Sequence, residues 1–81
     1  MTLTVHLFAR ARDLAGAGTV TVELPPGATV ADLRRELGRR FPALAGLLEV
    51  SAVAVNHDFA EDSHPLTADD EVAVIPPVSG G

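Results

Sequence analysis

The sequence predicts an α+β fold in which a mixed sheet of four to five strands packs on one main helix. Three observations predict it. Residues 2–8 and 19–24 alternate polar and apolar residues with the period of two that is typical of half-buried strands. Residues 30–41 then place apolar residues at steps of three and four, as an amphipathic helix does. Two further strand-like runs, residues 51–56 and 71–75, follow this helix.

The first two strands are expected to pair as an antiparallel hairpin. Between them, residues 9–16 are rich in alanine and arginine and predict one or two helical turns that end at Gly16. The turn residues Pro25, Pro26 and Gly27 end the second strand. Alternate apolar residues of both strands are expected to face the core, namely Leu3, Val5, Leu7, Val20, Val22 and Leu24.

The main helix has a recognisable start and end. Thr29 is a plausible N-cap, with Asp32 three residues later in a position like that of a capping box. Pro42 should stop the helix at Phe41. The apolar stripe consists of Val30, Leu33, Leu37 and Phe41.

The second half of the chain predicts two longer strands and one short edge strand. Leu44, Leu47 and Leu48 are expected to fill the core from the connection. The run 56–58 is typical of a turn, and the short edge strand should lie around Phe59 and Ala60. The turn at 64–66 should bury Leu66. Inward positions are Val53, Val55, Val72 and Val74, and outward positions are Ala52, Ala54, Ala73 and Ile75.

Composition bounds the function. The 81 residues make one domain, and a hydrophobic content of 47% supports a real core. The absence of cysteine excludes disulfides, thiolate metal sites and a thiol nucleophile. No run reaches the length of a membrane span and no charged-then-apolar leader opens the sequence, so a cytoplasmic chain is expected.

The net charge is −5, and all six positive charges are arginines. Arg34, Arg35, Arg39 and Arg40 cluster, but Glu36 can pair with the last two across one helical turn. We therefore expect a solvated helix face, with neither nucleic acid nor membrane as partner.

Self-contained catalytic constellations are missing. His6, His57 and His64 belong to three separate predicted elements without ligand spacing, so surface or turn roles are expected and no metal site. The sequence does not predict a complete enzyme.

The end of the sequence carries the functional signal. Residues 1–75 should form the domain and residues 76–81 an extended, flexible tail, because two prolines end the last strand. A glycine terminus leaves the carboxyl carbon uncrowded for chemistry. The tail reads Pro76, Pro77, Val78, Ser79, Gly80 and Gly81.

With these elements placed, the chain resembles the small subunits of molybdopterin synthase, which are sulfur carriers with the ubiquitin-like β-grasp fold. The tail carries the most specific resemblance, with Ser79 where threonine is common. The other resembling motifs are residues 7–9, 13–16, 55–56, 64–66 and 70–73.

The resemblance implies a mechanism and partners. An ATP-using activating enzyme, with magnesium, would adenylate the carboxylate of Gly81, and a sulfur donor protein would convert it to a thiocarboxylate. The tail would then enter the large synthase subunit, in an expected heterotetramer, and pass sulfur to cyclic pyranopterin monophosphate. This chain would supply a nucleophile on a tether and bind no cofactor itself.

Docking is expected on the face beside the tail. Because a β-grasp sheet places the first and last strands side by side, outward Phe8 and Ile75 should lie close together, with His6 and Ala73 nearby. Exposed apolar groups there predict a surface that binds a partner.

Three alternatives stay open at this point. A related carrier could serve thiamine synthesis or tRNA thiolation. A ubiquitin-like modifier would pass Gly81 to lysines of target proteins. An interaction domain without catalytic partners would need no free terminus.

Overall fold

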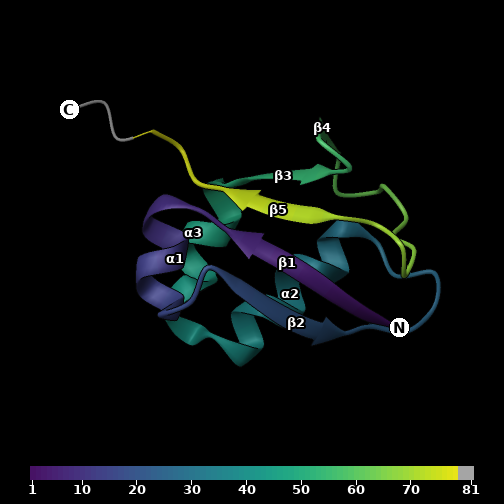
Figure 1. The fold of residues 1–81 in the computed structure, drawn as a ribbon, viewed down its shortest axis with the longest axis horizontal. Helices are drawn as coiled ribbons and strands as arrows, with labels where there is room; N and C mark the ends of the chain where they lie inside the picture. Colours follow the sequence, from purple (N-terminus) through teal and green to yellow (C-terminus); the bar gives the residue numbers. More distant parts are fainter. Residues whose placement is uncertain (79–81) are drawn as a thin grey trace.

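The computed structural model describes residues 1–78, which form a five-stranded mixed sheet with helices packed on one face (Figure 1). The strand order is β2-β1-β5-β3-β4. In it β1 and β5 run parallel, and the other neighbouring strands are antiparallel. The strands are β1 (Thr2–Leu7), β2 (Thr19–Glu23), β3 (Ala52–Val55), β4 (Asp58–Phe59) and β5 (Val72–Ile75).

The α+β class and the mixed sheet are thus confirmed, as are the approximate positions of the five strands. The antiparallel pairing of β1 with β2 is also confirmed, although the helix α1 (Ala9–Ala15) lies in their connection. Gly16 ends α1 in the left-handed conformation, with a φ of 73°, as its sequence position predicted.

The main helix, α2 (Val30–Arg40), has the predicted start and end. Its capping box is reciprocal: the Thr29 N–H donates to the Asp32 carboxylate at 2.9 Å, and the Asp32 N–H donates to the Thr29 hydroxyl at 3.4 Å. The backbone hydrogen bond from Thr29 lowers the pKa of Asp32 below its ordinary value. Phe41 is the C-cap residue, directly before Pro42.

The connection after α2 is helical, which sequence reasoning missed. It consists of η1 (Pro42–Leu44) and α3 (Ala45–Val50). The residue before α3, Leu44, makes no side-chain capping bond, and Gly46 lies in the first turn, so no local start signal exists. Leu44 and Leu48 are buried as predicted, whereas Leu47 is only partly buried.

The core lies between the sheet and the helices. Every inward position predicted for β1, β3 and β5 is buried, and so is Leu66, in the loop between β4 and β5. Val20 and Phe41 are only partly buried against this core. No helix among the described residues is long and apolar enough to cross a membrane. The largest fully buried side chains are Leu3, Leu7, Leu33, Leu37, Leu44, Val5, Val22, Val30, Val53, Val72 and Val74.

The arginine cluster is only partly a solvated face. Arg39 pairs with Glu36 as predicted, with a nitrogen–oxygen distance of 2.6 Å. The predicted pairing of Arg40 with Glu36 is wrong, because Arg40 donates instead to the backbone carbonyl of Thr21 on β2 at 2.6 Å. This hydrogen bond forms because α2 packs against β2. That packing is tertiary, so the sequence around Arg40 does not predict it.

Arg34 departs furthest from the prediction. Its guanidinium donates to the carbonyls of Leu48 and Ser51, the latter at 2.7 Å, and to the Asp62 carboxylate at 2.8 Å. The Arg34 side chain is 21% exposed, against 77% for Arg35. Arg34 therefore connects α2 to the end of α3 and to the loop before β5.

We expect Arg34→Met to lower the free energy of unfolding by about 2 kcal/mol, because the hydrogen bonds from its charged guanidinium to two backbone carbonyls and to Asp62 are lost. Urea denaturation followed by circular dichroism measures this. Arg35→Met is the matched control and should change stability by less than about 0.5 kcal/mol. Equal stability of the two variants would contradict the bridging role of Arg34.

Candidate functional site

The outward face of the sheet, opposite the helices, carries a row of side chains across four strands. The strand register pairs His6 with Ala73, Ala73 with Ala54, and Ala54 with Phe59. Residues that lie directly opposite each other on neighbouring strands share one face of the sheet, so these four side chains point to the same side. Ile75 lies two residues beyond Ala73 on that face, and Phe8 follows the end of β1 beside it.

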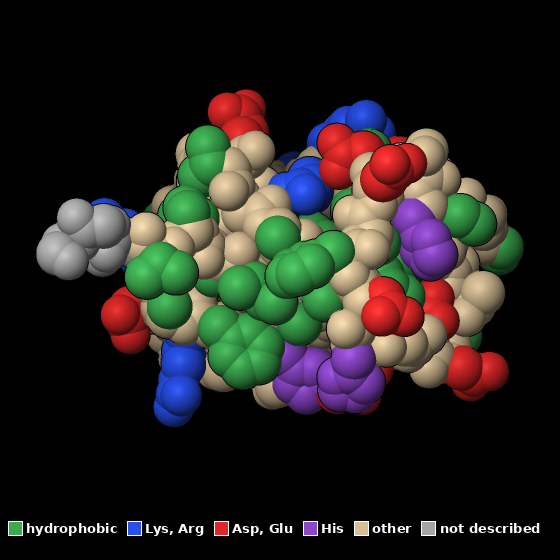
Figure 2. Space-filling model, turned by 90° about the horizontal axis from the view of Figure 1, so that it is seen from above, with side chains coloured by type: hydrophobic (Ala, Val, Ile, Leu, Met, Phe, Trp, Pro, Cys, Tyr) green, Lys and Arg blue, Asp and Glu red, His purple; other side chains and the backbone are tan. Residues whose placement is uncertain are grey.

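This arrangement forms a shallow apolar hollow of about 290 Å³. The two alanines form its floor because their side chains are small, and the larger side chains of Phe8, Phe59 and Ile75 form its walls. Figure 2 shows hydrophobic side chains gathered on this part of the surface, with two histidines at the border. We call the surface formed by Phe8, Ala54, Phe59, Ala73 and Ile75 the docking patch.

The sequence-predicted neighbours His6, Phe8, Ala73 and Ile75 are therefore brought together. Phe59 belongs to the docking patch as well, although sequence reasoning assigned it only to an edge strand. Phe59 is 76% exposed and Phe8 is 50% exposed, whereas the inward residues of β1, β3 and β5 are almost completely buried. A signal existed in the sequence, since a hairpin turn at 56–57 places Phe59 opposite outward Ala54.

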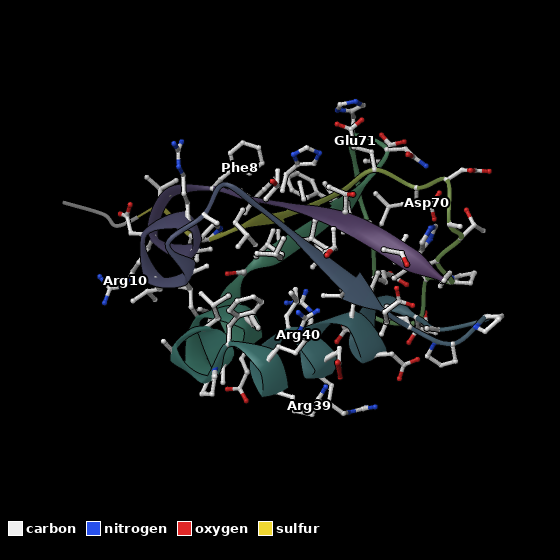
Figure 3. All side chains as sticks on the ribbon, turned by 60° about the horizontal axis from the view of Figure 1, so that its bottom comes forward. Phe8, Arg10, Arg39, Arg40, Asp70 and Glu71 are labelled. Atoms are coloured by element: carbon white, nitrogen blue, oxygen red, sulfur yellow. The ribbon has the colours of Figure 1, made fainter. Side chains whose placement is uncertain are left out.

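A carboxylate lies at the border of the docking patch, between two imidazoles. Glu71 Oε1 is 3.7 Å from His6 Nε2, and Glu71 Oε2 is 3.4 Å from His57 Nε2. Figure 3 shows Phe8 and Glu71 on one side of the sheet and Arg39 on the opposite, helical side. His6 and His57 thus meet at Glu71 from separate elements, a convergence that their sequence spacing did not predict.

The turn between β3 and β4 positions this cluster. Asn56 and His57 both have positive φ angles, 52° and 72°, as a tight hairpin turn requires. The Asn56 side chain accepts from the Glu71 N–H at 2.9 Å and donates to the Asp70 carboxylate at 2.9 Å. The Thr67 N–H also donates to the Asp70 carboxylate, and this hydrogen bond is the main cause of the lowered pKa of Asp70. The turn is thereby fixed to the residues that lead into β5.

The chain leaves the sheet beside the docking patch. Strand pairing ends at Ile75, as the two following prolines predicted. Pro76 is buried against the domain, whereas Pro77 and Val78 are exposed. The expectations for Ser79, Gly80 and Gly81 lie outside the described residues. Within residues 1–78, no group of three or more His, Cys, Asp or Glu side chains is arranged to hold a metal ion.

Comparisons with known proteins agree with this architecture. A model of the ThiS family matches residues 5–81. The molybdopterin synthase sulfur carrier subunit of Arabidopsis thaliana is 39% identical over 98% of this chain and 82% of its own length. SAMP1, the small archaeal modifier protein 1 of Haloferax volcanii, is 32% identical, with a TM-score of 0.88 and complete coverage of both chains.

A third similarity concerns the fold alone. A complex of subunits 1 and 2 of the molybdopterin-converting factor from Helicobacter pylori contains a chain that matches with a TM-score of 0.72. That chain is 24% identical, and the match covers all of both chains.

The strand order and the structural similarity to SAMP1 define a ubiquitin-like β-grasp protein. The chain belongs to the ThiS family, within which it is similar to the sulfur carrier subunits of molybdopterin synthase.

Proposed function

We propose that this chain is the sulfur carrier subunit of a molybdopterin synthase and acts in the cytoplasm. The observation that carries the proposal is the similarity to such carrier subunits, which extends over 98% of the chain at 39% identity. The tail sequence Pro76-Pro77-Val78-Ser79-Gly80-Gly81 supports it, because a slender glycine end suits chemistry at a carboxyl group inside a partner's site.

The proposed chemistry takes place at Gly81. A carboxylate resists attack by a sulfur nucleophile until one of its oxygens becomes part of a good leaving group. An activating partner supplies this by transferring AMP from ATP, with magnesium, to the carboxylate. A sulfur donor at the oxidation level of sulfide then displaces AMP and leaves a thiocarboxylate. Its sulfur attacks the pterin precursor in the large subunit, and hydrolysis of the resulting thioester leaves the sulfur on the precursor and returns the Gly81 carboxylate. The chain contributes a nucleophile on a tether, and the partners contribute the acid–base groups and ATP.

The docking patch is the proposed contact surface for both the activating enzyme and the large subunit. It lies where β5 leaves the sheet, so a partner bound there is placed to receive the following residues. Large exposed aromatic side chains are the groups from which interface hot spots are commonly made. Because a single patch serves both partners, they bind one after the other, and this matches a carrier that is loaded and then unloaded.

A second candidate function is that of a protein modifier, which the similarity to SAMP1 favours. Both functions begin with activation of the terminal carboxylate, and they differ in the acceptor. The sequence contains no lysine, so lysine-linked polymers of this chain cannot form. Attachment to lysines of other proteins is the activity that distinguishes a modifier from a carrier.

Reconstitution tests the proposed function. The purified chain is incubated with the activating enzyme and the large subunit of its own organism, ATP, magnesium, a sulfur donor and the pterin precursor. We expect molybdopterin to form only when the chain, the activating enzyme and ATP are all present. Failure to form molybdopterin, together with ATP-dependent attachment of the chain to lysines of added proteins, would favour the modifier.

A further inference from the structure

We propose that Glu71 receives a cationic side chain of the large subunit at the border of the docking patch, and that His6 and His57 make this contact depend on protonation. The inference rests on the proposed function and specifies how the docking patch recognises its partner. It assigns a role to the one charged cluster that lines the apolar hollow within the described residues.

The geometry leaves the Glu71 carboxylate able to accept new hydrogen bonds. Its contacts with the imidazole nitrogens of His6 and His57, at 3.7 and 3.4 Å, are longer than ordinary hydrogen bonds. The Glu71 side chain is 55% exposed. An ionised carboxylate offers about four acceptor positions, and a guanidinium can occupy two of them in parallel.

The charges around the cluster favour a cation as the partner group. No arginine lines the hollow in the part of the chain described here. The other charged groups on the adjoining segments are also acidic: Asp58 at the start of β4, and Asp69 and Asp70 directly before Glu71. The whole chain carries a net charge of −5 with neutral histidines. A lysine or arginine of the partner can lay its apolar stem on the docking patch and its charge on Glu71.

The two histidines give this contact a defined response to pH. With neutral imidazoles the cluster of Glu71, His6 and His57 has a charge of −1, and with both protonated it has +1. Protonation of histidine is the ordinary source of a protein's response to pH near neutrality. Asp70 does not contribute to this pH response. The hydrogen bonds from the Thr67 N–H and the Asn56 amide lower its pKa, so it stays ionised throughout. Binding of the cationic group should therefore strengthen as pH rises and should release protons.

Calorimetric titration of the full chain with the large subunit tests this at about pH 5.5 and about pH 8. For the unaltered chain we expect affinity about two- to fivefold higher at the upper pH, the effect of one partly exposed ion pair. Glu71→Gln should bind more weakly than the unaltered chain at both pH values, because the carboxylate that receives the cation is lost. The double variant His6→Gln with His57→Gln should lose most of the pH dependence.

Glu49→Gln, on α3 in the helical layer, is the control with the same change of charge and should keep the affinity and pH dependence of the unaltered chain. The inference alone is overturned if Glu71→Gln binds as tightly as the unaltered chain at both pH values, or if the double histidine variant keeps the full pH dependence. If the unaltered chain binds the large subunit at neither pH, the proposed function is overturned, and this inference with it.

Discussion

Removal of Gly81, or addition of residues after it, should abolish sulfur transfer while the domain stays folded. The transferred sulfur is proposed to be bonded to the carboxyl carbon of Gly81, so a chain that ends elsewhere presents no group for adenylation at the correct reach. Folding should persist because the hydrophobic residues of the described core run from Leu3 to Val74. The measurements are molybdopterin formation in the reconstituted reaction and the thermal unfolding midpoint.

A removable extension is the matched control for this prediction. A chain extended after Gly81 by a segment that a protease removes should be inactive before cleavage and active after it. The prediction fails if the extended chain supports molybdopterin formation while mass spectrometry shows it untrimmed.

Phe8→Asp and Ile75→Asp should each weaken binding of the large subunit or of the activating enzyme about thirtyfold or more, which corresponds to about 2 kcal/mol. A carboxylate placed in the apolar hollow would be desolvated by the partner without a counter-charge. Phe59→Asp, at the opposite wall of the hollow, should have a comparable effect. Calorimetric titration gives the affinities.

Stability and an off-patch variant separate docking from folding. Val50, on α3, is also an exposed hydrophobic residue, 63% exposed, and Val50→Asp should leave affinity unchanged. The docking-patch variants should unfold at nearly the temperature of the unaltered chain, unlike Leu33→Asp, which places a charge in the core. Unchanged affinity in both Phe8→Asp and Ile75→Asp would show that the partners bind elsewhere.

Local patterns were sufficient to predict most of the fold. The alternation in residues 2–8 and the capping box at Thr29 concern neighbouring residues, and both are found as expected. The helix α3 escaped because a helix of six residues without a capping side chain derives its stability from packing of Leu44 and Leu48 against the core. That packing depends on the tertiary structure, which a sequence window does not contain.

The part of the site that depends on the order of the strands in the sheet was predicted from the sequence. Placing Phe8 beside Ile75 required only that the first and last strands be neighbours, and the parallel register of β1 and β5 confirms this. The histidine pair around Glu71 depends instead on how the β3–β4 turn curls over the residues before β5. Arg34 likewise donates to carbonyls 14 and 17 residues further along the chain. Side-chain pairing within a helix concerns residues three or four apart, so the sequence did not predict these partners.

The most direct test of the central claim is the intact mass of the chain purified from its own cells, with fragmentation to locate any modification. The carrier account predicts a free pool of the chain, part of which shows the mass gain of one oxygen replaced by sulfur, located at Gly81. The opposite result, in which the chain occurs mainly as covalent adducts on other proteins and no thiocarboxylate is found, would contradict the account and identify a modifier.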